Sequence, residues 1–222
     1  MQSPHTAEHI SSLWLIYHGS RSNGTGRGYL SASMTRPQYE AMLARALRYP
    51  VFVLPLSRKL AAEEADSTRS QADTTEFYFM QWDFYDRAEA PSHVDPSSIE
   101  VISPRPQMGR SLLPHNSSVI LTPLEEYKLR GTYAQPRLVI THYPDFAGTH
   151  NVVLLRGEIA KSDSGNFLLS QIDAQILALT LQKFYLPSES ATSQNTFELL
   201  RTFHEAPDAF DYQRLMDATI HI

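Results

Sequence analysis

The sequence contains no cysteine among its 222 residues, and this absence excludes several kinds of site at once. Without thiols the chain can form neither disulfide frameworks nor thiolate zinc centres, and it has no cysteine nucleophile. A chain of this length can be stabilised by its hydrophobic core alone, and the lack of disulfides suits a reducing compartment. The two Asn-x-Ser/Thr sequons, at Asn23 and Asn116, do not outweigh this, because such triplets arise often by chance.

Long apolar runs and clusters of positive charge are also missing. No apolar run approaches the ~18 residues of a membrane-spanning helix, so membrane insertion is not expected. The formal net charge is -5 and the Lys and Arg residues are scattered along the chain, so no basic stripe is expected to bind nucleic acid. The first residues resemble neither a secretory signal nor a transit peptide, and we expect that any targeting peptide has been removed.

The hydrophobic pattern predicts a single α+β domain spanning residues 1–222. Helical periodicity is expected over the ranges 4–18, 36–48, 171–185, 196–205 and 211–219, and strands are expected near 29–30, 51–56, 76–85, 118–121, 137–143 and 151–159. The elements do not alternate as βαβ units, and 137–143 and 151–159 are joined by a short turn. We therefore predict a mainly antiparallel β-sheet flanked by helices.

Helix starts and loops are indicated by local signals. Thr35, Pro37 and Gln38 form a capping box, and the helix that follows should bury one stripe: Tyr39, Met42, Leu43, Ala46 and Leu47. The segment Thr122-Pro123-Leu124-Glu125 predicts a second capping box, opening a short helix that ends at Gly131. The ranges 19–28, rich in glycine, and 86–116, with five prolines, are predicted to be flexible loops.

Two motifs that could bind a ligand are judged weak. His5, Glu8 and His9 match a zinc-peptidase pattern, but the motif lies at the chain end with no evident third ligand, so we predict no metal site. The glycines from Gly24 to Gly28 fit no nucleotide-binding fingerprint and lead into a strand, so we predict no bound phosphate. No catalytic residue, cofactor or metal is therefore expected.

Two further groups leave alternatives open. His142 and Asp145 flank a turn where acid/base pairs occur, but no nucleophile is evident, so a hydrogen-bonded structural histidine is favoured over a small hydrolase. Arg156 and Glu158 lie on one strand face with Gly157 between them. They form either a surface ion pair or a docking contact, in which the glycine lets a partner's backbone approach.

Several segments together resemble the mitochondrial ATP synthase F1 complex assembly factors that chaperone the β subunit. The most specific of them are 121–129, 142–145 and 153–158, and the likeness continues in the same order through 10–14, 50–56, 81–82, 175, 181–185, 203, 207 and 210–211. The resemblance covers nearly the whole chain. The resemblance rests mainly on the fact that the segments occur in the same order along the chain, and less on any single segment.

The resemblance implies a mitochondrial matrix protein, not an enzyme, that is a monomer when free. It implies binding of the unassembled F1-ATP synthase β subunit, which is protected from aggregation until the α subunit displaces it, with no cofactor. The expected contact residues are the polar or mixed positions of the matching segments: Leu124, Glu125, Glu126, Tyr127, Lys128, Arg156 and Glu158. Besides the hydrolase, a second alternative is a scaffold that recruits a partner through 86–116, in which case deleting that loop would abolish binding.

Overall fold

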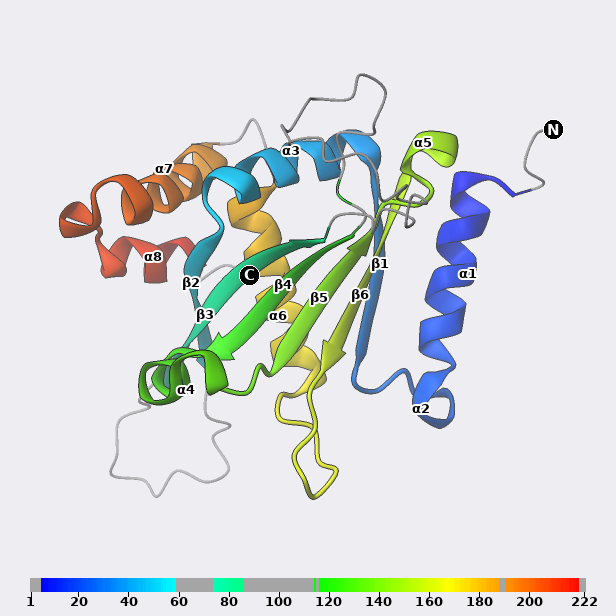
Figure 1. Cartoon of the computed structure of the whole chain (residues 1–222), viewed down its shortest axis with the longest axis horizontal. Helices are drawn as coiled ribbons and strands as arrows, with labels where there is room; N and C mark the ends of the chain where they lie inside the picture. Colours follow the sequence, from blue (N-terminus) through cyan, green and yellow to red (C-terminus); the bar gives the residue numbers. More distant parts are fainter. Residues whose placement is uncertain (1–4, 59–73, 86–113, 115, 188–190, 220–222) are drawn as a thin grey trace, which may run out of the picture.

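The computed structural model describes residues 5–58, 74–85, 114, 116–187 and 191–219 (Figure 1). Its centre is a six-stranded antiparallel sheet with the strand order β1-β6-β5-β4-β3-β2. The strands are β1 (Tyr29–Thr35), β2 (Val51–Arg58), β3 (Thr74–Tyr85), β4 (Asn116–Pro123), β5 (Leu138–Tyr143) and β6 (Val152–Ile159). The predicted fold class, α+β with an antiparallel sheet and flanking helices, is confirmed.

Helices connect the strands and extend the chain at both ends of the sequence. They are α1 (Ala7–Gly19), α2 (Arg21–Gly24), α3 (Arg36–Arg48), α4 (Leu124–Arg130), α5 (Ala147–His150), α6 (Gln171–Tyr185), α7 (Ala191–Glu205) and α8 (Tyr212–Thr219), with 3-10 turns at Gly131–Tyr133 and Pro207–Ala209. Within these described elements, no helix is both long and apolar enough to cross a bilayer.

Helix α3 begins and ends where the sequence predicts. The side chain of Gln38 accepts a hydrogen bond from the Thr35 backbone N–H at 2.9 Å, and the Thr35 hydroxyl accepts one from the Gln38 N–H. This reciprocal cap satisfies two N–H groups that a helix start otherwise leaves unpaired. Four residues of the predicted stripe are buried, but Leu47 is 61% exposed, so that part of the prediction is wrong.

The predicted capping box at Thr122 is also wrong. Strand β4 continues through Pro123, and Thr122 pairs with Phe79 of β3 in the sheet ladder. Thr122 is thus committed to the strand, and α4 starts after Pro123 without a side-chain cap. Gly131 does end the helix, with a φ of 57° that glycine adopts at little cost.

The two predicted loops have different outcomes. Residues 19–28 contain α2 and a compact turn, in which the Ser22 hydroxyl donates to the Arg27 carbonyl at 2.7 Å. Asn116 belongs to β4, while most of the predicted loop 86–116, and with it the scaffold alternative, lies outside the described residues. The flexibility predicted for 19–28 and 86–116 remains a prediction.

One face of the sheet carries the core. Successive strand residues point to opposite faces, and alternate positions such as Phe52, Leu54, Met80, Leu121 and Ile140 are fully buried. Helices α3, α6, α7 and α8 cover this side and contribute to the same apolar cluster. Figure 1 shows α6 running behind the strands.

The other face, which we call the open face, is the side onto which Gln81, Ile120 and Val139 project. Helix α1 covers its β1–β6 end, where Ile10 and Trp14 pack on Val152 and Leu154. Helix α4 covers part of its β3–β4 end, where the ring of Tyr127 stacks on Phe79 at 4.2 Å. Between the two helices, Ile120 and Val139 are half-buried and Gln81 is exposed.

Gly157 is a steric requirement of the core. A Cβ added to it would lie 2.9 Å from the Cβ of Leu30, its neighbour on β1. We expect Gly157→Ala to lower the free energy of unfolding by about 1–3 kcal/mol, because Leu30 or β6 must shift. Urea denaturation measures this. Gly148→Ala, where a Cβ meets nothing within 4 Å, is the matched control and should change stability by less than ~0.5 kcal/mol. Equal effects of the two substitutions would contradict the packing argument.

Candidate functional site

His142 is held inside the core by polar and aromatic neighbours. Its Nδ1 lies 3.3 Å from the Ser117 hydroxyl, which also lies 2.9 Å from the Tyr39 hydroxyl. The imidazole stacks on Trp82 with ring centroids 5.5 Å apart. Burial lowers the pKa of His142 from 6.5 to about 4, because the charged ring would lose its hydration. The favoured interpretation, a structural histidine, fits this environment.

The hydrolase alternative is not supported by this geometry. Ser117 is within hydrogen-bond reach of His142, as a nucleophile would need to be, but both side chains are 0% exposed. A substrate cannot reach a hydroxyl enclosed between the sheet and α3. Asp145 is exposed in the turn after β5 and, unlike Ser117, is not part of this buried group.

The metal pattern at the start of α1 stays incomplete. Nδ1 of His5, just before α1, and Nδ1 of His9, in its first turn, are 3.1 Å apart, and both side chains are exposed. A protein zinc site normally needs a third protein ligand. Across the residues that the structure describes, no group of three or more metal-ligating side chains comes together.

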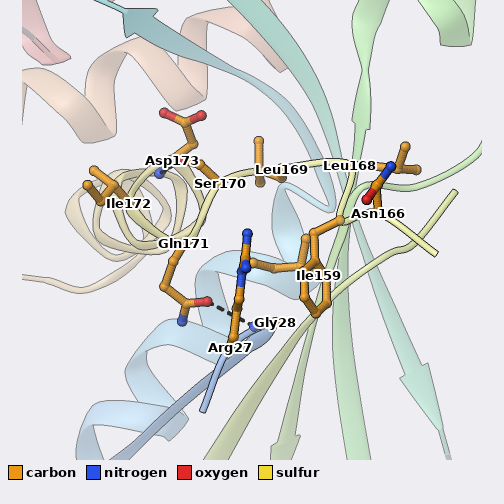
Figure 2. A pocket seen from close by; sticks show the side chains of 11 residues that line it. Arg27, Gly28, Ile159, Asn166, Leu168, Leu169, Ser170, Gln171, Ile172 and Asp173 are labelled. Carbon is orange, nitrogen blue, oxygen red and sulfur yellow. Dashed lines mark hydrogen bonds between the residues drawn. The ribbon is translucent and has the colours of Figure 1, made fainter. Parts of the chain in front are cut away.

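The glycine-rich segment is occupied by contacts within the protein. The N–H of Gly28 donates to Oε1 of Gln171 at 3.0 Å, as Figure 2 shows, and Nε2 of Gln171 donates to the Tyr29 carbonyl. Gly28 and Gln171 border an open pocket of about 720 Å³ beside the start of α6. The Ser170 hydroxyl caps α6, and the Asp173 carboxylate stands in its first turn. Arg27 and Asp173 both line the pocket, so its lining carries charges of both signs and is not specialised for an anion.

Arg156 and Glu158 form the ion pair expected of a surface interaction. Arg156 Nε and Glu158 Oε1 are 3.4 Å apart on the open face, with side chains 29% and 45% exposed. Solvent screening limits such a pair to at most about 1 kcal/mol. Gly157 between them faces Leu30, so the space left by its missing side chain is filled within the chain and not by a partner.

The predicted contact residues of α4 divide into anchors and exposed groups. Tyr127 is fixed by its stack on Phe79, and Glu126 accepts a hydrogen bond from the Gln135 N–H at 3.2 Å. Leu124 is half-buried, while Glu125 and Lys128 are exposed. Since α4 packs on the open face, all seven predicted contact residues lie on or beside that face, although β5 separates the β3–β4 end under α4 from the Arg156–Glu158 pair on β6.

Sequence reasoning did not identify several exposed apolar side chains beside α4 and on α1. Leu129 and Tyr133, next to the predicted α4 contacts, are 86% and 90% exposed. On α1, Ile16 is 67% and Tyr17 57% exposed. For α1, the sequence did contain a signal of this exposure, because no Asp, Glu, Lys or Arg occurs from 9 to 20. A helix with one side packed on the protein normally carries charged residues on the other side.

The burial of His142 predicts a pH-dependent stability. Because the folded state takes up the proton only near pH 4 and the unfolded state near pH 6.5, the contribution of His142 is full above pH 6.5. It is lost as the pH falls from 6.5 to about 4. At pH 5 the loss is about 2 kcal/mol.

Urea unfolding of the wild type and of His142→Phe at pH 7.5 and pH 5 measures this contribution. We expect a smaller drop in the variant, whatever its absolute stability, while His9→Gln, which alters an exposed histidine, should behave as the wild type. Equal drops in the wild type and His142→Phe would contradict the assignment.

Comparison with known proteins gives a consistent result. The family model described as ATP11 protein matches residues 1–216. The relative named "Protein atp11, mitochondrial", from Schizosaccharomyces pombe, is 30% identical over 207 residues, which are 93% of this chain and 54% of that protein. "ATP synthase mitochondrial F1 complex assembly factor 1" of Mus musculus is 20% identical over 211 residues, 95% of this chain and 47% of that protein.

The chain spans about half the length of these two curated relatives. The family match itself includes the whole sheet and all of the helices α1 to α7. It also includes every one of the seven predicted contact residues, from Leu124 to Glu158. The chain belongs to the ATP11 protein family.

Proposed function

We propose that this chain is an assembly chaperone of mitochondrial F1-ATP synthase, which binds the unassembled β subunit and prevents its aggregation until the α subunit displaces it. The observation that carries the proposal is the family match, together with the name of the mouse relative, which is that of an F1 complex assembly factor. Both relatives are named as mitochondrial, and we place this chain in the mitochondrial matrix on that ground.

Exposed apolar side chains give the proposal a physical basis. A subunit of a large obligate complex exposes apolar surface until its neighbour arrives, and such surface promotes aggregation. A chaperone must present apolar groups of its own to cover it. Ile16 and Tyr17 on α1, and Leu129 and Tyr133 beside α4, are groups of this kind.

Polar groups near these side chains suit a complex that must later dissociate. Glu125 and Lys128 are exposed on α4, and the Arg156–Glu158 pair is partly exposed on β6. Interfaces between partners that also exist apart combine an apolar centre with a polar rim. We assign the rim to Leu124, Glu125, Glu126, Tyr127, Lys128, Arg156 and Glu158, in which Tyr127 and Glu126 hold α4 in place.

Co-purification with separately expressed F1 subunits tests the proposal. We expect the chain to capture the β subunit and not the α subunit, to suppress β aggregation measured by light scattering, and to release β when α is added. Capture of neither subunit would contradict the proposed function.

Reversal of the exposed α4 charges tests the rim. The double variant Glu125→Lys, Lys128→Glu should weaken β capture about threefold to tenfold, mainly through slower association, with the fold unchanged. Surface plasmon resonance measures the association and dissociation rates separately, and two salt concentrations show whether the effect on association is electrostatic. Arg36→Glu, on α3 at the other side of the sheet, is the control, and an equal loss there would show that α4 has no specific role.

A further inference from the structure

Helix α1 exposes apolar side chains where a surface helix normally carries charge. Leu13, Ile16 and Tyr17 are 47%, 67% and 57% exposed, and no formally charged residue occurs from 9 to 20. Exposed apolar groups that occur singly need no explanation, but these three are neighbours at i, i+3 and i+4. Together they form a continuous apolar strip, which we call the α1 strip.

The α1 strip is directed away from the core helices. Ile10 and His18 are buried toward the sheet. Leu15 lies on one flank of α1, where it lines a groove of about 520 Å³ with Tyr29 of β1 and Gln171 of α6. Successive helical residues are about 100° apart, so the α1 strip lies on the flank opposite to Leu15. That flank is turned away from α6.

A second set of exposed apolar groups borders the same face of the sheet. Leu129 and Tyr133 follow Tyr127, whose stack on Phe79 places α4 on the open face. Figure 1 shows the strands of the sheet between α1 and α4. The sheet surface there is also hollowed, since Tyr29, Val139 and Glu158 line a groove of about 420 Å³.

The size of the α1 strip argues against a second copy of this chain as its occupant. Three large side chains that are about half exposed offer roughly 300 Å², since each such side chain has about 150–250 Å² in total. A contact between two such strips would bury roughly 600 Å², about half of what a stable interface needs. The occupant must therefore reach beyond α1, across the sheet toward α4.

Charge indicates the chemistry of that occupant. The α1 strip is uncharged, whereas α4 exposes Glu125 and Lys128 at the other border. A membrane surface is bound by helices rich in Lys and Arg, which α1 does not have between 9 and 20. A partner protein whose surface is apolar, with charged groups at one end, would match both borders of the open face.

We propose that the open face, bounded by the α1 strip and by Leu129 and Tyr133, is where one unassembled F1 subunit docks. This inference rests on the proposed function and adds its location: the subunit lies across β6, β5 and β4 and contacts both helices at once. The α1 strip is the apolar anchor, α4 supplies the charged rim, and the helical side formed by α3 and α6 stays free.

Two double variants with matched exposure test this location. Ile16→Ser, Tyr17→Ser removes most of the α1 strip, and Ile172→Ser, Leu179→Ser removes side chains of α6 that are 69% and 53% exposed on the helical side. We expect the α1 variant to weaken β capture roughly tenfold to 100-fold, as loss of interface anchors does, and the α6 variant to change it less than twofold. All four positions are exposed, so circular dichroism and thermal unfolding should show that both variants fold.

Other outcomes separate the inference from the proposed function. If the wild type captures β but the α1 variant binds equally well, or the α6 variant loses binding, the location is wrong and the proposed function stands. If the wild type captures neither subunit, both fail. If the α1 variant instead loses self-association in sedimentation velocity, or loses binding to cardiolipin-containing vesicles, with β capture unchanged, the occupant is a second copy or a lipid surface and the inference is overturned.

Discussion

Burial of one face of the sheet under α3, α6 and α7 is the interaction on which the rest of the structure depends. Phe52, near the start of β2, packs its ring against Phe184 of α6 and Phe203 of α7, at 4.9 and 5.2 Å between centroids. The same layer encloses His142. On this face of the sheet, the side chain of Leu30 leaves no room for a Cβ on Gly157. Because these helices lie on one side, the helices that cover the other side, among the residues that the structure describes, are α1 and the short α4.

Incomplete cover of the open face connects fold and function. An antiparallel sheet can expose one face to water if that face is polar, and here it is mixed, with the Arg156–Glu158 pair beside Val139 and Ile120. Helices α1 and α4 add exposed apolar side chains at the two borders of the open face and leave the strands between them uncovered by either helix. With this arrangement, a partner can bind to the open face and leave it again without disturbing the core on the other side of the sheet.

The fold was predictable where local signals and burial agree. The capping box of α3 and the short connection between β5 and β6 were both evident, because each depends on residues close in sequence. The Thr122 cap failed because pairing with β3, a long-range interaction, outweighed a local motif. The predicted burial of Leu47 was wrong because helical periodicity shows which way a side chain points and not whether another element packs over it.

The candidate site was less predictable from local sequence patterns than the fold was. The resemblance to F1 assembly factors indicated α4 and the Arg156–Glu158 segment, but it could not show that Leu129 and Tyr133 stand free. On α1, Trp14 reaches the sheet, where its Nε1 donates to the Leu155 carbonyl, whereas Leu13 and Tyr17 are about half exposed, and the apolar spacing alone does not separate them. Which apolar residues of a helix are covered depends on the neighbours that tertiary structure brings.

Hydrogen exchange of this chain, alone and in complex with the F1 β subunit, tests the central claim most directly. We expect added protection in α1 and in α4 with its following turn, 124–133, while α6 exchanges as it does in the free chain. Protection concentrated in α3 and α6, with α1 and α4 unchanged, would contradict it.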